Sequence, residues 1–320
     1  MTTAAATMSR RRLGRLEGAA LRGVIVRELV NFSSFWRSST FSSTVDPTIY
    51  LLAFGFGFGS LVSTVAGYSY IDFVATGIVA TTVLFSGAFP AMYGTFVKYT
   101  FQHTYDAILA APVDTEELVT GEALWIAART GVYGCVPMLV GIVFGLNPSW
   151  GMLLVPLIAA LAGYGWACFG IFIAAKSNKI ESFSYWQSGL LTPMFLVAGT
   201  FFPLTKLPEW AQVLGNINPL YHCVELVRSA VFGTWGLVDL WHLGFLVGFA
   251  LISWRLAIGV WRLAAPADCS ELAQSPANRE PPSANRRSVV LTTTPVSTRF
   301  PTGTRTRAPA GGSGNSSGTE

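Results

Sequence analysis

Residues 130–175 form a 46-residue stretch without one charged side chain, and this feature constrains the chain most. A helix needs about 20 apolar residues to cross the hydrocarbon core of a bilayer, so the stretch is long enough for two crossings. Asn147-Pro148-Ser149-Trp150 supplies a turn near its middle. Only 12% of the residues are charged, about half the share of a soluble domain. The sequence therefore predicts an integral membrane protein and excludes a soluble enzyme and a nucleic-acid-binding protein.

Four further apolar stretches predict four more membrane spans. They cover residues 47–67, 73–97, 182–205 and 240–261. The predicted fold is an all-α membrane protein with six transmembrane helices, in a domain that covers residues 45–263. Residues between the fifth and sixth spans are less apolar, and we expect short re-entrant helices there at the outer surface.

Arginine and lysine are concentrated on one side of this predicted topology. Seven arginines precede the first span, and Lys176 and Lys179 lie between the fourth and fifth spans. The loops after the first and third spans carry neither residue type. Because cytoplasmic loops carry an excess of lysine and arginine, we expect both termini in the cytoplasm and residues 206–239 outside.

The two ends of the chain differ from its middle. Residues 1–44 contain apolar residues at helical spacing on one arc: Leu21, Ile25, Leu29, Phe32 and Trp36. This pattern predicts an amphipathic helix on the membrane surface, and a helix packed against a protein partner fits it equally well. Residues 264–320 are rich in Pro, Ser, Thr and Gly and lack apolar periodicity, which predicts a disordered cytoplasmic tail.

The predicted spans contain almost no ionisable side chains. Ion-coupled transporters usually keep carboxylates, lysine or histidine inside the membrane to bind ions or relay protons. The sequence has no phosphate-binding loop of the GxxxxGK[ST] kind, and its four cysteines form no CxxC pair. We therefore expect no catalytic, cofactor or metal site on this chain, so that energy for transport must come from a partner.

The segment after the second predicted span contains the start of a long helix. Asp114 and Glu117 form a capping-box pattern, because an acid at the cap position is followed three residues later by glutamate. We expect a helix over about residues 115–145, which is longer than the hydrocarbon core is thick. Its first turns must then project into the cytoplasm.

Two side chains of that helix are placed to interact. Glu122 and Arg129 lie seven residues apart on one helix face, which predicts an ion pair between them. An ordinary solvated helix start accounts for the acids equally well. The amphipathic run before Pro112 predicts a short helix parallel to the membrane.

Two composite motifs carry the strongest functional signal. The first reads TFQxTxDAILAxPV over residues 100–113 and continues as GExLW at residues 121–125. The second reads AGTFFPL at residues 198–204, LPxW at residues 207–210 and NPLYHxVELVR at residues 218–228. Together they resemble the nodulation-factor (lipo-oligosaccharide) export permeases, a branch of the ABC-2 type of ABC transporter membrane subunits.

The resemblance implies a permease in the inner membrane of a prokaryote that forms a homodimer on two copies of an ABC ATPase subunit. ATP and Mg would bind to that partner, and the cargo would be an amphipathic molecule such as a lipo-oligosaccharide, glycolipid, polysaccharide or hydrophobic drug. The residues implied to couple to the ATPase are Phe101, Gln102, Thr104, Asp106, Ala110, Pro112 and Glu122. The residues implied for an outer gate are Phe202, Pro203, Pro208, Trp210, Asn218, Pro219, Tyr221, His222, Glu225 and Arg228.

Two other function classes remain open from the sequence. A membrane-embedded enzyme acting on lipid-linked sugars would need interfacial acids or histidines, and His222, Glu225 and Asp239 are the candidates. An ion-coupled secondary transporter is the third possibility.

Overall fold

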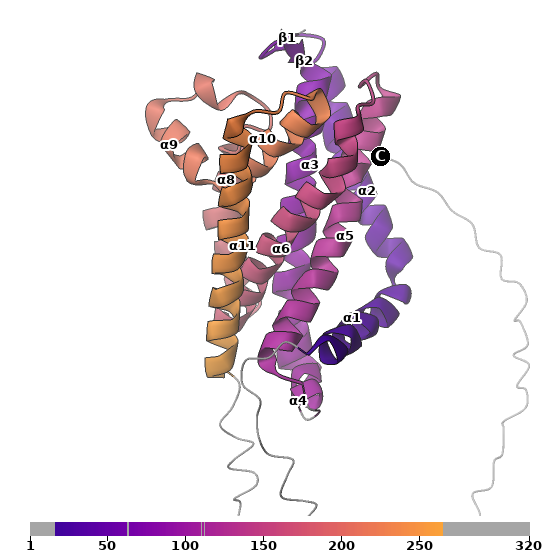
Figure 1. The fold of residues 1–320 in the computed structure, drawn as a ribbon, viewed down its shortest axis with the longest axis vertical. Coiled ribbons are helices and arrows are strands. Elements are labelled where there is room, and N and C mark those ends of the chain that lie inside the picture. The colour runs from indigo at the N-terminus through magenta and orange to yellow at the C-terminus, as the bar shows by residue number, and fades with distance from the viewer. Residues whose placement is uncertain (1–16, 63, 110, 112, 265–320) are drawn as a thin grey trace, which may run out of the picture. The chain divides into compact units, whose positions relative to one another are not determined.

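The computed structural model describes residues 17–62, 64–109, 111 and 113–264. The predicted tail beyond Ala264 lies outside these residues, as do Ala110 and Pro112 of the implied coupling motif. The described chain is mostly helical (Figure 1).

The α-helices are α1 (Gly18–Ser33), α2 (Trp36–Gly57), α3 (Tyr70–Phe89), α4 (Thr104–Leu109), α5 (Thr115–Val143), α6 (Val155–Lys176), α7 (Ser182–Trp186), α8 (Thr192–Leu196), α9 (Glu209–Ile217), α10 (Pro219–Phe232) and α11 (Leu237–Ala264). The π-helical segments are η2 (Pro90–Gly94), η3 (Val97–Phe101) and η5 (Gln187–Leu191), and the 3-10 turns are η4 (Trp150–Leu154) and η6 (Leu204–Lys206). Strands β1 (Thr64–Val65) and β2 (Tyr68–Ser69) pair in antiparallel register, with Thr64 opposite Ser69.

Four helical elements in the described part of the chain are long and apolar enough to cross a membrane. They are Tyr70–Phe101, Thr115–Val143, Trp150–Lys176 and Leu237–Leu263, which correspond to the second, third, fourth and sixth predicted spans. The predicted turn at residues 147–150 lies between α5 and α6, and its last residue, Trp150, begins η4. The mostly helical membrane fold is therefore confirmed, and the count of six spans stays a prediction.

The first predicted span differs from the structure in its bounds. A helix is predicted over residues 47–67, but α2 begins at Trp36 and ends at Gly57. Its first half is rich in serine and threonine, so it gave no apolar signal. The β1–β2 hairpin follows at residues 64–69, and its two-residue turn, Ala66-Gly67, has positive φ at both positions.

The fifth predicted span is also shorter than expected. Residues 182–205 are predicted as one helix, but the helical path through α7, η5 and α8 ends at Leu196. Gly199 has a φ of 74°, which turns the chain there. The loop then packs against α3, where a Cβ on Gly77 would lie 2.4 Å from the carbonyl oxygen of Thr200.

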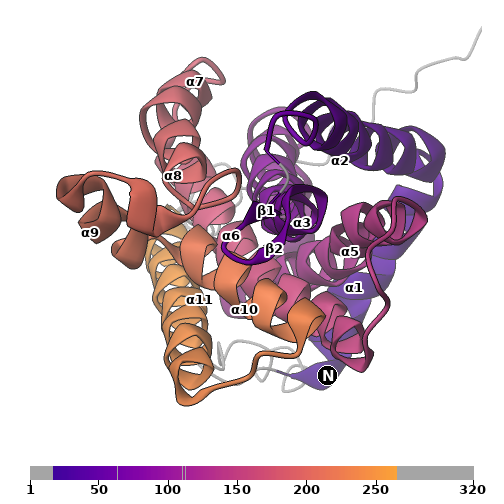
Figure 2. The ribbon, with the colours of Figure 1, turned by 90° about the horizontal axis from the view of Figure 1, so that it is seen from above.

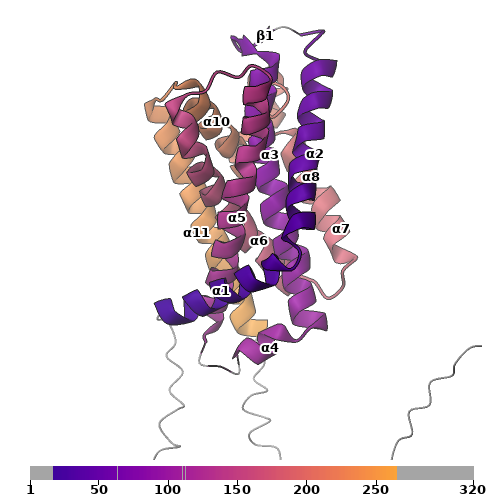
Figure 3. The same cartoon turned by 90° about the vertical axis from the view of Figure 1, so that its right-hand side faces the viewer.

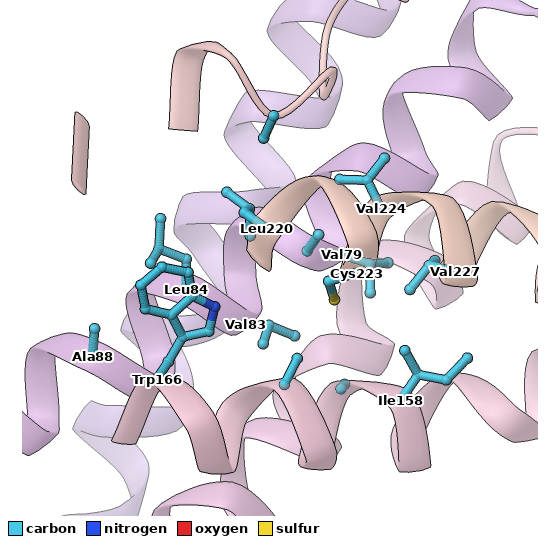
Figure 4. Close-up of a cluster of buried hydrophobic side chains, with 14 of the residues drawn as sticks. Val79, Val83, Leu84, Ala88, Ile158, Trp166, Leu220, Cys223, Val224 and Val227 are labelled. Atoms are coloured by element: carbon cyan, nitrogen blue, oxygen red, sulfur yellow. The ribbon is translucent and has the colours of Figure 1, made fainter. Parts of the chain in front are cut away.

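The central helix is α6, which contacts α3, α5, α10 and α11. Its Trp166 is 1% exposed and lies in the main core. Figure 4 shows that α10 closes this core with the side chains of Leu220, Cys223, Val224 and Val227. Helix α10 is thus anchored by apolar packing, although it is not one of the four long spans.

The bundle has two distinct ends. Helix α1 lies across one end with α4 beside it (Figure 3), and we call this the α1 end. At the opposite end α10 lies across the bundle with α9 next to it (Figure 2), and we call this the α10 end. The implied coupling residues that the structure describes therefore lie toward the α1 end, and the implied gate residues lie toward the α10 end.

Candidate functional site

Five buried or half-buried side chains from four elements form a hydrogen-bonded group at the α1 end. This basal cluster consists of Glu28 on α1, Thr95 and Lys98 on the helical path of η2 and η3, Tyr105 on α4 and Glu122 on α5. Lys98 Nζ lies 2.9 Å from both carboxylate oxygens of Glu28 and 2.8 Å from Oε1 of Glu122. Thr95 Oγ1 donates to Oε1 of Glu122 at 3.0 Å, and the Tyr105 hydroxyl donates to Oε2. The cluster therefore joins four elements through one lysine and two carboxylates.

Burial makes these contacts strong. Glu122 is 1% exposed and Glu28 is 5% exposed, so that solvent screens their charges little. Burial, followed by the charge of Glu122, raises the pKa of Tyr105 well above its ordinary value of 10.0. Its phenol consequently stays protonated and continues to donate to the carboxylate.

The start of α5 holds α1 and α11 in place around this cluster. Glu117 closes the predicted capping box, because the Asp114 backbone N–H donates to its Oε2 at 3.0 Å. Its other oxygen accepts the Glu17 backbone N–H, just before α1, at 2.6 Å. Glu116 forms an ion pair with Arg262 at the end of α11. The predicted helix start at residue 115 is therefore confirmed and ties two other helices to α5.

The short helix α4 inserts one side chain, Tyr105, into the bundle and exposes its outer face to solvent. Tyr105 is 1% exposed and its ring lies 4.9 Å from that of Trp261 on α11. Asp106, by contrast, has a side chain that is 53% exposed. His103 just before the helix has a φ of 48°, which turns the chain out of η3.

The implied coupling residues divide into two groups. Phe101, Gln102 and Asp106 are exposed and Thr104 is half-buried at the α1 end. Glu122 lies beneath them in the basal cluster. Their coupling role stays a prediction.

The predicted ion pair between Glu122 and Arg129 is wrong. Glu122 binds Lys98, which lies closer across the helix interface. The guanidinium of Arg129 instead lies 5.8 Å from the ring centroid of Phe32 and 6.0 Å from that of Tyr133.

At the α10 end, Arg228 links α10 to the preceding loop and to α3. Its Nη1 donates to Oε1 of Glu225 at 2.8 Å, and its Nη2 donates to the carbonyl of Gly199 at 2.7 Å. The guanidinium carbon lies 3.8 Å from the ring centroid of Phe73. Burial lowers the pKa of Arg228 from its ordinary value, and the Glu225 carboxylate opposes that shift.

His222 and its neighbours hold α10 from its other face. The Nδ1 atoms of His222 and His242 lie 2.6 Å apart, and Nε2 of His222 lies 2.9 Å from the Asn216 carbonyl. Asn218 caps α10, since its Oδ1 accepts the Leu220 N–H, while its Nδ2 donates to the Met194 carbonyl. Pro219 follows as the first helical residue, the position that proline favours.

The remaining implied gate residues lie outside these hydrogen bonds. Phe202, Pro208 and Trp210 are exposed, and Pro203 and Tyr221 are half-buried. Trp210 continues into an exposed apolar stripe of α9 formed by Val213, Leu214 and Ile217. A role of these residues in a gate stays a prediction.

The residues that an enzyme acting on lipid-linked sugars would need are all engaged in structural bonds. Glu225 binds Arg228, and Asp239 accepts from the Ser229 hydroxyl at 2.7 Å and from the Gly236 backbone N–H at 2.7 Å. Within the described residues, no three His, Cys, Asp or Glu side chains lie close enough together to hold a metal ion.

Several members of both sites were missed from the sequence. The sequence assigned none of Glu28, Thr95, Lys98, Tyr105 and His242 to a site. The sequence alone did not point to Glu28, because its place follows from a tertiary contact: Val24, four residues earlier, packs on Gly121 of α5. Glu28 therefore lies on the face of α1 that is turned toward the bundle.

Comparison with known proteins agrees with the motifs. A sequence profile described as ABC-2 type transporter matches residues 20–232. Nodulation protein J of Sinorhizobium fredii is 30% identical over 230 residues, which cover 70% of this chain and 87% of that protein. Nodulation protein J of Rhizobium meliloti is 32% identical over 227 residues, covering 70% and 86%. Inner membrane transport permease YadH of Escherichia coli is 24% identical over 245 residues, covering 74% and 94%. The resemblance seen in the motifs is confirmed, and the chain belongs to the ABC-2 type transporter family of membrane permeases.

Proposed function

We propose that this chain is the permease subunit of an ATP-driven exporter, which moves an amphipathic molecule from the cytoplasmic side outward. In this proposal the chain works as a homodimer with two ATPase subunits and crosses the membrane six times. The α1 end and both termini face the cytoplasm. The named relatives support a transport role, and the cargo class rests on the motif resemblance.

One observation carries the proposal, namely that the exposed face of α4 is fixed to a buried charged cluster. A partner that binds Phe101 and Asp106 would push on a helix whose Tyr105 is hydrogen-bonded to Glu122. Glu122 is bonded in turn to Lys98 at the end of another long span. Movement of α4 would therefore pass directly to α5 and to the Tyr70–Phe101 span.

Charge placement supports the separation of energy supply from permeation. The basal cluster pairs its one lysine with two carboxylates at the end of the bundle. The long spans themselves are lined by apolar cores. Such a chain can transmit movement between its helices but has few ionisable groups inside the membrane with which to catalyse a reaction or bind ions.

Co-purification tests this function. The full chain, co-expressed with an ABC ATPase encoded beside it, is expected to purify as a complex that hydrolyses ATP. Asp106→Lys and Phe101→Ala should each reduce the recovered ATPase several-fold, because both change the exposed α4 face. Trp210→Ala is the matched control, since Trp210 is equally exposed at the opposite end. Complex formation that is insensitive to the α4 variants, or that is lost equally in Trp210→Ala, would refute the proposal.

A further inference from the structure

Arg129 is a cation that forms no direct ion pair with any described carboxylate, and Glu28 acts on it only at longer range. It lies in α5 seven residues beyond Glu122, about 10 Å further along the helix axis. Its Nε is buried and has no hydrogen-bond partner. In the part of the chain that the structure describes, none of its guanidinium nitrogens is hydrogen-bonded and no carboxylate forms an ion pair with it.

The carboxylates nearest in the fold are already occupied. Glu28 and Glu122 both bind Lys98, and Glu28 also lies 3.3 Å from Arg27. Three cations, Arg27, Lys98 and Arg129, therefore share two carboxylates. Of these three cations, Arg129 is the one that no described carboxylate contacts directly.

Aromatic rings frame the guanidinium. Trp125, Arg129 and Tyr133 follow one another at four-residue intervals, so they lie along one face of α5. Phe32 of α1 lies against this face, with ring centroids 5.6 Å from Trp125 and the Arg129 guanidinium 5.8 Å away. The Tyr133 hydroxyl is hydrogen-bonded to Thr40 of α2 at 3.1 Å. The guanidinium is thus held by α5 at the place where α1 passes into α2.

The chemistry of these groups selects an oxyanion. A guanidinium presents five N–H donors in a planar fork that matches phosphate and carboxylate oxygens. Leaving such a charge unpaired at membrane depth is unfavourable. The phenol and hydroxyl of Tyr133 and Thr40 add polar groups at the same place.

The surface beside Arg129 is apolar. Val132, one helical turn further along α5, is 67% exposed, and Phe35 and Trp36 at the α1–α2 junction are 45% and 48% exposed. An anion that arrives here with an apolar body can bury that body against these side chains. A free ion has no such gain.

We propose that Arg129 binds the phosphate group of an anionic membrane amphiphile that lies against α5 and the α1–α2 junction. The site belongs to this chain alone and does not depend on an ATPase partner or on the direction of transport. The phosphate chemistry would serve a resident lipid and a phosphate-bearing cargo alike.

Native mass spectrometry of the purified full chain in detergent tests the site. The protein is titrated separately with phosphatidylglycerol, with phosphatidylcholine and with inorganic phosphate. We expect one tightly bound phosphatidylglycerol, with weaker binding of phosphatidylcholine and none of inorganic phosphate. Arg129→Gln should weaken phosphatidylglycerol binding about 10-fold or more, as loss of charge-assisted hydrogen bonds predicts. Arg129→Lys should have a smaller effect, because the charge remains while the planar fork is lost.

Arg255→Gln is the matched control. Arg255 also lies in a long span near an aromatic ring, 5.5 Å from the Trp254 centroid, but it is exposed. Its substitution should change phosphatidylglycerol binding less than about 2-fold, since a charge at an exposed surface contributes little. Equal weakening in both variants, or no weakening in Arg129→Gln, would overturn the proposal.

The titrations with inorganic phosphate and phosphatidylcholine distinguish a soluble anion from a lipid headgroup as the ligand. Inorganic phosphate that binds with the same dependence on Arg129 would assign the site to a soluble anion and overturn the amphiphile. If phosphatidylcholine binds as tightly as phosphatidylglycerol, the proposal that the amphiphile must be anionic is overturned. If Arg129→Gln does not purify as a folded protein, the phosphatidylglycerol binding of Arg129→Lys and Phe32→Leu decides whether the site exists. Phosphatidylglycerol binding that is unchanged in both would reject the site.

Discussion

The Nδ1 atoms of His222 and His242 face each other at 2.6 Å and join α10 to α11. Nε2 of His222 points at the Asn216 carbonyl, which can only accept, so that nitrogen must carry a proton. In the neutral ring Nδ1 is then the acceptor, and Nδ1 of His242 must donate. With both rings neutral, this arrangement of protons satisfies the contact, and protonation of both rings would break it, because two N–H donors would then face each other.

The first prediction is that acid weakens this contact. His222 is 1% exposed, and burial lowers its pKa from the ordinary value of 6.5. Between the folded and unfolded pKa values the unfolded chain binds more protons, so the free energy of unfolding falls as the pH falls below about 6.5. We expect the melting temperature of the detergent-solubilised protein to drop by several degrees between pH 7.5 and pH 5. His222→Gln should flatten this part of the pH profile.

His103→Gln is the control for that experiment. The chain has three histidines, and the His103 side chain is 73% exposed. Its loss should leave the pH profile unchanged. The prediction fails if His103→Gln flattens the profile and His222→Gln does not.

The second prediction concerns Lys98 in the basal cluster. Lys98→Met leaves the carboxylates of Glu28 and Glu122 buried without their shared cation. Removal of one partner from a buried ion pair costs about 3–5 kcal/mol. Thermal unfolding should show a loss of this size. Glu122→Gln should cost less, because the amide oxygen still accepts hydrogen bonds and Lys98 keeps Glu28.

Lys179→Met provides the comparison for that loss. Lys179 is exposed, and an exposed lysine contributes within about 0.5 kcal/mol. Equal stability of Lys98→Met and Lys179→Met would contradict the description of the cluster as buried and mutually dependent.

The sequence predicted the parts of this fold that depend on local composition. Long uncharged stretches identified the four clear spans, and the Asp114 and Glu117 pattern placed the start of α5 at the correct residue. It failed for α2, where polar residues from Trp36 onward are helical although they look unlike a span. Hydropathy detects a helix by its transfer free energy, and a polar helix packed on the bundle lacks that signal.

The sites were less predictable than the fold for a physical reason. Motif resemblance placed Glu122 and His222 in functional segments, but not their partners. Lys98 and Glu28 are 70 positions apart, and their contact follows from how α1 packs on α5. Sequence spacing can suggest only ion pairs within one helix, such as Glu122 with Arg129. In the structure Glu122 instead pairs with Lys98 from another helical element.

The third prediction uses the close approach of α3 to the loop after α8. A Cβ added to Gly77 would lie 2.4 Å from the Thr200 carbonyl oxygen, which is backbone and cannot rotate away. Gly77→Ala should therefore destabilise the protein by about 1–3 kcal/mol through overpacking. In Gly244→Ala the new methyl group meets no atom within 4 Å, so alanine in this helix should be neutral or stabilise by up to about 1 kcal/mol. Chemical or thermal unfolding of both variants decides, and equal effects would contradict the close contact.

The fourth prediction tests the proposed orientation with introduced cysteines. Native Cys223 cannot serve as a probe of the outer segment, because it is 0% exposed. His103 at the α1 end and Lys206 at the α10 end are both exposed, and each is replaced by cysteine in a background with Cys135→Ser and Cys269→Ser. The arginines before the first span predict a cytoplasmic α1 end under the positive-inside rule. A membrane-impermeant thiol reagent should therefore label Lys206→Cys in intact cells and His103→Cys only after permeabilisation. The reverse pattern would invert the topology and, with it, the side from which an ATPase can reach α4.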